Sequence, residues 1–357
     1  MKTKLIILMV FLLAPWIAGA QMHTARKSYK GSYFSDNKTE ISINNKYGDI
    51  TIATIPGDSV IITAYVEAID KDSMEAEEQL SEIEVKVDAS GYFIQALTIF
   101  NGNQNDFKTD WKMMTGSVFN SNKSLKINYI VEIPEGRSLQ INNAYGNIIM
   151  QDYSGILTVN LTAGQFTAGH LSGKTTFELI GGKAQFRSAN NISVKADMNE
   201  FAADSIGTAF FDSRGSQIRI TQSDVITVDS RRDKWFLESV NQISGSGNFS
   251  SFTIGNLVKD CNLKTFYGNL TLSKIDPAFH SINLITGSSD VSIALPQNIT
   301  PQFQCEQKKS RTLFPARLNL KTDTIDAKAQ QFRTYNSVEN ATTFINLNVS
   351  GGSVNVY

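Results

Sequence analysis

Alternating apolar and polar residues dominate this chain, in short runs that are separated by turns at Gly, Asn or Asp. The clearest example is the stretch 44–52, Asn-Asn-Lys-Tyr-Gly-Asp-Ile-Thr-Ile, which returns at 142–150 and in a shorter form at 265–272. Alternation with a period of two predicts half-buried strands, and Gly beside Asn or Asp predicts a turn between them. Each copy therefore predicts a strand-turn-strand element, with its turn at Gly48, Gly146 or Gly268.

Between residues 146 and 233 the predicted turns recur at a nearly constant spacing. They fall at Gly146, Gly164, Gly182, Asn199, Gly215 and Asp233, with steps of 18, 18, 17, 16 and 18 residues. Gly, Asn and Asp accept the left-handed backbone conformation at low cost, which explains their place at turns. Less regular turns follow at Gly247, Gly268 and Gly287.

This period is typical of a parallel β-solenoid, in which each unit buries its apolar side against its neighbours. The chain is therefore expected to be all-β, with a solenoid of about nine coils of roughly 18 residues each. An antiparallel β meander or sandwich would give a similar pattern. The parallel form is favoured because each unit also holds a second, looser link of about seven to nine residues, as a returning coil requires.

The pattern divides the chain into regions. Residues 21–36 are polar and predict a flexible lead-in, and residues 37–135 predict an N-terminal β region with one short helix near 72–82. The repeats span 136–295. The period fails after Leu295, so 296–357 are expected to be a C-terminal β capping region. The Asn-rich stretch 101–122 is the longest loop candidate.

The first twenty residues predict a signal peptide. Lys2 and Lys4 precede an apolar run at 5–16, and the small residues 18–20 follow as a cleavage site. The run is too short to span a bilayer, and no later stretch predicts a transmembrane segment. Removal of two lysines leaves 31 basic residues against 34 acidic ones, a charge of −3. Such a balance favours neither nucleic acid nor an anionic membrane as a partner.

The sequence predicts no catalytic, cofactor-binding or metal-binding residues. The three histidines are not spaced as a metal pair, and no nucleophile elbow or phosphate loop is present. One cluster of charged residues, Asp229, Arg231, Asp233 and Glu238, would suit acid-base chemistry, although a solvated surface is the favoured explanation, because such charges on a strand or turn more often face water. Trp235 beside the cluster is expected in the core. Cys261 and Cys305 can either pair in an oxidising compartment or stay as buried thiols.

The chain resembles the DUF4097 family of candidate adhesins, especially exported members from Bacteroidetes. The resemblance rests on the three Tyr-Gly turns, the acidic helix near Glu75, the strand end at 131–134 and the repeated Gly turns. It implies an all-β, solenoid-like fold and a location in the cell envelope or at the surface. No catalytic residue is carried over.

These observations predict a non-catalytic exported protein, an adhesin or scaffold that presents an elongated β surface in the periplasm, at the outer-membrane surface or outside the cell. A cell-surface glycan or an envelope protein is the expected partner, without a cofactor. The alternative is a polysaccharide lyase or hydrolase on a β-helix scaffold, which the Asp229 to Glu238 cluster motivates.

Overall fold

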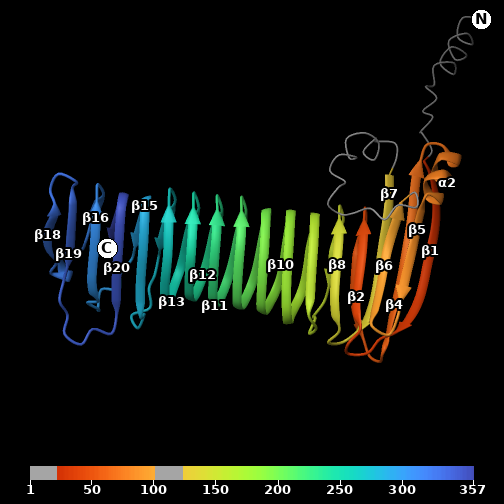
Figure 1. Cartoon of the computed structure of the whole chain (residues 1–357), viewed down its shortest axis with the longest axis horizontal. Coiled ribbons are helices and arrows are strands. Elements are labelled where there is room, and N and C mark those ends of the chain that lie inside the picture. The colour runs from red at the N-terminus through yellow and green to blue at the C-terminus, as the bar shows by residue number, and fades with distance from the viewer. Residues whose placement is uncertain (1–21, 101–123) are drawn as a thin grey trace, which may run out of the picture.

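The computed structural model describes residues 22–100 and 124–357. The expected signal peptide and the expected loop at 101–122 lie outside these residues. The described chain is all-β, with one 20-stranded sheet, the helix α2 and a short 3-10 helix, η2. Figure 1 shows the strands stacked side by side along the long axis of the molecule.

The elements fall into three groups along the chain. The first group is β1 (His23–Phe34), β2 (Glu40–Lys46), β3 (Ile50–Ile55), β4 (Ser59–Asp70), α2 (Ser73–Ser81), β5 (Ile83–Ala89), β6 (Phe93–Phe100) and β7 (Ser124–Pro134). The second is β8 (Ser138–Ala144), β9 (Ile148–Met150), β10 (Leu157–Arg214), β11 (Gln217–Arg231), β12 (Lys234–Asn248), β13 (Ser251–Phe266), β14 (Asn269–Leu272) and β15 (Ser281–Ile293). The third is β16 (Gln302–Lys308), β17 (Arg311–Leu313), η2 (Ala316–Leu318), β18 (Lys321–Asp326), β19 (Gln331–Tyr335) and β20 (Phe344–Val356).

Successive passes of the chain pair in parallel through the middle of the molecule. Ile218 in β11 lies opposite Phe201 in β10 on one side and Trp235 in β12 on the other. We call each pass a rung. A rung consists of an incoming arm such as 225–231, a turn, and an outgoing arm such as 234–237, and each arm pairs with the same arm of the next rung. This parallel pairing excludes an antiparallel meander for β8 to β15.

The apolar residues of the alternating pattern fill the space between the arms. Phe201, Phe211, Trp235 and Phe252 are all buried. Trp235 lies with its ring centre 5.0 Å from that of Phe211 and 5.9 Å from that of Phe252, and its indole N–H donates to the Ser230 hydroxyl at 2.9 Å. Trp235 is therefore a core residue, as the sequence predicts.

The N-terminal segment is ordered as a strand, which corrects the expected flexible lead-in. Residues 23–34 form β1, which pairs antiparallel with β4 along its whole length. Long amphipathic side chains explain why so polar a sequence forms a strand. The Lys27 ammonium donates to the carbonyls of Leu80, at 2.6 Å, and Ile83. It thereby fastens β1 to the last turn of α2 and the first residue of β5, and the helix dipole favours a cation at that end of α2.

Helix α2 occupies the predicted place. It spans Ser73–Ser81, and the Asp72 carboxylate caps its first turn by accepting from the Met74 amide at 2.8 Å. Its contacts are with β1, β4 and β5 at the end of the stack, as Figure 1 shows.

At the C-terminal end the order of the rungs differs from the order of the chain. The last strand, β20, pairs in parallel with β15 on one side and with β16 and β17 on the other. Strand β19 then pairs antiparallel with β16, and β18 with β19. The segment 302–335 thus lies beyond β20 in the stack, and β18, fully exposed, forms the edge.

The two cysteines are buried and free. Cys261 lies opposite Ile282, which lies opposite Ile345, which lies opposite Phe303 in the strand that holds Cys305. The two strands are thus three rungs apart, about 14 Å at the usual strand spacing. This separation is about twice the Cα distance that a disulfide can bridge. Of the two readings that the sequence allows, the structure has the buried thiols, and burial raises the pKa of each to about 12.

Candidate functional site

The turns between incoming and outgoing arms are the most regular surface feature of the stack. Of the eight predicted turn residues, only Gly182 and Gly215 have a positive φ. In most rungs the left-handed residue stands one position earlier, as at Ala163 (φ 50°), Met198 (φ 54°) and Arg232 (φ 58°). The same holds for the tyrosines of the Tyr-Gly motif, Tyr47, Tyr145 and Tyr267. The predicted explanation of the glycines by positive φ is therefore wrong for Gly48, Gly146, Gly164 and Gly268.

Close approach of the neighbouring rung explains these glycines instead. A Cβ atom on Gly146 would lie 1.9 Å from the carbonyl oxygen of Gly48, and one on Gly164 would lie 2.0 Å from that of Gly146. A Cβ on Gly268 would lie 2.1 Å from the Ser250 carbonyl oxygen. Such distances are far below van der Waals contact, so only glycine fits at these positions.

In the other rungs a buried polar side chain takes the place of glycine. The Ser216 hydroxyl accepts from the Asn199 amide at 3.1 Å, and the Asp233 carboxylate accepts from the Ser216 amide at 2.7 Å. The Ser250 hydroxyl accepts from the Asp233 amide at 3.2 Å. Each partner is 17 residues away, so these contacts link one turn to the next. The turn residue equivalent to Asn199 and Asp233 is Ser216, and the predicted Gly215 holds the left-handed position before it.

The predicted surface cluster does not converge. Asp233 is 1% exposed, and its carboxylate also accepts from the hydroxyls of Ser213 and Ser230 at 2.7 and 2.6 Å. It is a structural group of the turn, which corrects its assignment to the surface. Asp229 and Arg231 lie on the incoming arm before this turn, whereas Glu238 follows the outgoing arm. The arrangement that would suit an acid-base pair is therefore not assembled from these four residues.

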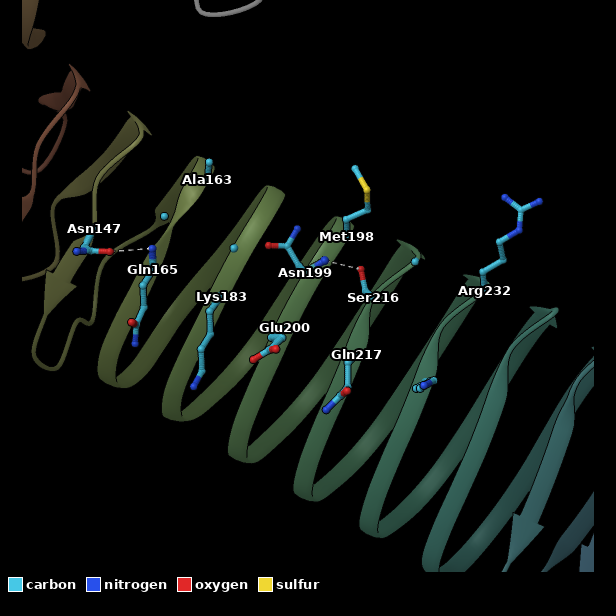
Figure 2. A pocket seen from close by; sticks show the side chains of 14 residues that line it. Asn147, Ala163, Gln165, Lys183, Met198, Asn199, Glu200, Ser216, Gln217 and Arg232 are labelled. Carbon is cyan, nitrogen blue, oxygen red and sulfur yellow. Dashed lines mark hydrogen bonds between the residues drawn. The ribbon is translucent and has the colours of Figure 1, made fainter. Parts of the chain in front are cut away.

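The turns of six successive rungs line a groove of about 770 Å³, which we call the turn groove. Gly164, Gly182, Asn199 and Ser216 lie along its length, and Ala163, Met198, Gly215 and Arg232 border it on the side of the left-handed positions. The first residues of the outgoing arms border the other side; they are Gln165, Lys183, Glu200, Gln217 and Lys234. Figure 2 shows Gln165, Lys183 and Gln217 projecting to the same side, and Met198 and Arg232 projecting to the opposite side.

The charged side chains of the turn groove have no interaction partner in the described part of the protein. Within residues 22–100 and 124–357, the side chains of Lys183, Glu200, Arg232 and Lys234 form no ion pair and no hydrogen bond. Two cations on the incoming arms of the same rungs are paired instead. Lys195 contacts Glu178 at 3.2 Å, and Arg214 pairs with Asp197. The sequence contained a signal for this groove. Each outgoing arm begins with a polar residue, and these residues are spaced one repeat unit apart along the chain.

A second, smaller groove of about 460 Å³ crosses β13, β15, β20 and β16. Its amides bond to one another. The Asn283 side chain donates to that of Asn262 at 2.6 Å, and the Asn346 side chain donates to that of Asn283 at 2.9 Å. Because these side-chain amides fill one another's hydrogen-bonding capacity, they stabilise the stack. They leave fewer polar groups free to bind a ligand than the turn groove has.

Other chemistry in the described part of the chain is sparse. His170 hydrogen-bonds the Ser188 hydroxyl at 2.7 Å, and His280 contacts Asp260 at 3.1 Å; both histidines are exposed. Among the described residues, no three His, Cys, Asp or Glu side chains gather as metal ligands would. No helix there is long and apolar enough to cross a membrane.

Neither a protein-family model nor a curated protein sequence matches this chain. Solved structures resemble it at low identity. A candidate adhesin from Parabacteroides distasonis is 11% identical over 94% of this chain and 97% of its own, with a TM-score of 0.34. A candidate adhesin from Parabacteroides merdae is 12% identical over 76% and 96%, with a TM-score of 0.33. A candidate cell adhesion protein from Clostridium sporogenes is 12% identical over 92% and 99%, with a TM-score of 0.21. Values this low do not establish the family that the sequence resembles.

Proposed function

We propose that the protein is a non-catalytic, exported cell-envelope protein, in which residues 136–295 form a β-solenoid that presents an elongated surface for binding. Its place is the periplasm, the outer-membrane surface or the medium. Its role is that of an adhesin or scaffold, which is also the expectation from the resemblance to the DUF4097 family.

One observation carries this proposal: side chains that point outward from equivalent positions of successive rungs form continuous columns. The column at the start of the outgoing arms places Lys183, Glu200, Gln217 and Lys234 on four neighbouring rungs. Rungs repeat at about 4.8 Å. Such a surface offers evenly spaced contacts to an extended partner, whereas acid-base catalysis needs groups that converge on one reacting atom.

Co-sedimentation with bacterial envelopes tests the binding role. Purified protein that begins at Gln21 should pellet with isolated envelope fragments and stay in the supernatant without them. Protein that remains in the supernatant at every envelope concentration would contradict the proposal. A panel of polysaccharides tests the non-catalytic part, since sustained release of reducing ends or unsaturated products would show an enzyme.

Export has a separate test. Expression of the full chain in a Gram-negative host should yield a mature protein whose first residue is Gln21, as measured by intact mass. Recovery of the uncleaved chain from the cytoplasm would contradict export.

A further inference from the structure

We propose that the turn groove binds an acidic linear polysaccharide, whose carboxylate or sulfate groups contact Lys183 and Lys234. This inference rests on the proposed binding function and specifies its ligand. Four steps support it: the charge of the groove, the spacing of its cations, the state of its backbone and an aromatic pair beside it.

The groove is more positive than the protein as a whole. It holds three cations, Lys183, Arg232 and Lys234, against the single anion Glu200, whereas the whole chain has a formal charge of −1. None of these four groups has a charged partner within the described residues. A positive region on a slightly acidic protein selects for an anionic partner.

The spacing of the cations requires an extended partner. Lys183 and Lys234 stand at the same position of rungs that are three steps apart, about 14 Å along the stack at the usual strand spacing. Glu200 and Gln217 lie between them. A small anion reaches only one of the two lysines, whereas a polymer that runs along the stack reaches both.

The backbone of the groove favours a polysaccharide over an extended peptide. A peptide that adds to a sheet needs unpaired N–H and C=O groups. Here the amides of Asn199, Ser216 and Asp233 donate to side chains of the next turn, and that of Lys234 donates to the Ser216 carbonyl at 2.9 Å. Recognition therefore depends on side chains, and Gln165 beside Lys183 offers an amide to sugar hydroxyls.

An exposed aromatic pair continues the row of left-handed turn positions beyond the groove. Phe249 and Tyr267 occupy the left-handed position of the two rungs after Arg232, and their rings stack with centres 5.1 Å apart. The two side chains are 59% and 61% exposed. Such rings provide apolar surface for the C–H faces of sugars, next to Arg232 and on the side of the groove opposite Lys183 and Lys234.

Titration calorimetry with polygalacturonate, a linear polymer of uronic acid, tests the inference. Its fully methyl-esterified form is the matched ligand without charge. The test variant is the double substitution Lys183→Gln with Lys234→Gln. The control is Lys174→Gln with Lys259→Gln, which removes the same charge from two exposed lysines that do not line the groove. Thermal unfolding confirms that both variants fold.

The expected result is binding of polygalacturonate by the wild type, at least about fivefold weaker in the groove variant and within about twofold in the control. Binding should weaken as salt is raised, because salt screens exposed charges. Equal binding of the methyl ester, equal loss in both variants, or no binding of polygalacturonate would overturn the inference. Tighter binding of single-stranded DNA, lost in the groove variant, would also overturn it in favour of a nucleic acid.

Envelope sedimentation separates this inference from the proposed function. If the groove variant pellets with envelopes as well as the wild type and polygalacturonate does not bind, the polysaccharide assignment fails and the binding role stands. If the wild type does not pellet either, the proposed function fails as well.

Discussion

Two kinds of turn connect the rungs, and they differ in how they fill the same space. At Gly146, Gly164 and Gly182 the preceding rung approaches so closely that no side chain fits, and the chain advances by 18 residues (164 − 146 and 182 − 164). From Asn199 to Ser250 a polar side chain hydrogen-bonds the neighbouring turn, and the chain advances by 17 residues.

The comparison teaches that the glycine and the strained backbone are separate features of these turns. Both kinds place a residue with positive φ just before the variable position, as Ala163 and Met198 show. Glycine is needed at Gly164 because of the neighbouring carbonyl oxygen, whereas the polar turns satisfy buried backbone groups with side chains. Four changes test this distinction, and the largest effect comes from changing the spacing itself.

Deletion of half a unit should abolish folding, whereas deletion of a whole unit should not. Removing 164–181 joins Ala163 to Gly182, so a left-handed residue still precedes a glycine turn. Removing only 173–181 moves the next turn into the middle of an arm and directs apolar side chains outward. Circular dichroism during heating should show cooperative unfolding for the first deletion alone. Equal loss in both would argue against stacked, equivalent units.

Substitution at a glycine turn should be the most damaging single change. Gly146→Ala places a Cβ 1.9 Å from the Gly48 carbonyl oxygen, so two rungs must move apart. We expect the free energy of unfolding to fall by about 3 kcal/mol or more. Gly91→Ala is the control, because nothing lies within 4 Å of its added Cβ. A Gly146→Ala protein as stable as the control in urea would refute close approach as the reason for glycine.

Removal of the carboxylate from a polar turn should cost somewhat less. Asp233→Ala leaves the Ser216 amide and the hydroxyls of Ser213 and Ser230 without their acceptor. The expected loss is about 2–4 kcal/mol in urea unfolding. Asp233→Asn keeps one side-chain oxygen as an acceptor and should lose less. An alanine variant no weaker than the asparagine variant would show that the carboxylate does not join the turns.

Relief of the strain at a left-handed residue should have the smallest effect, and it should raise the free energy of unfolding instead of lowering it. Met198→Gly places glycine at φ 54° and removes an exposed side chain, so stability should rise by about 0.5–1 kcal/mol. Phe249→Gly relieves the same strain but loses the stacking on Tyr267, so we expect no gain. A lower melting temperature for Met198→Gly would show that its side chain contributes contacts of its own.

The sequence was sufficient for the strand period and for the core, because buried residues such as Ile218 and Ile220 alternate with polar neighbours. It was insufficient to show which residue of each turn is left-handed, because a glycine can indicate either a positive φ or the close approach of a neighbouring rung. Asp233 looked like a surface charge because its four hydrogen-bond donors come from residues up to 20 positions away. Strand β1 was missed because its pairing with β4 and its contact with α2 are long-range.

The candidate groove was also beyond a linear reading. Gln165, Lys183 and Glu200 are ordinary polar residues one by one, and they become a surface only when the rungs align them. Alignment of the units by their turn residue, taken as Ser216 and not Gly215, would have placed them in one column.

The position of β20 has a consequence for the order of assembly. Strands β16 to β19 are synthesised before β20, yet their place in the stack is on its far side. They reach that place only after the thirteen residues of β20 have inserted beside β15. Until then the edges of β15 and β16 both expose unpaired backbone groups, which are open to strands of other molecules. Completion of this end is therefore a late, long-range event in folding. The interval before it is the time when the chain is most prone to aggregate.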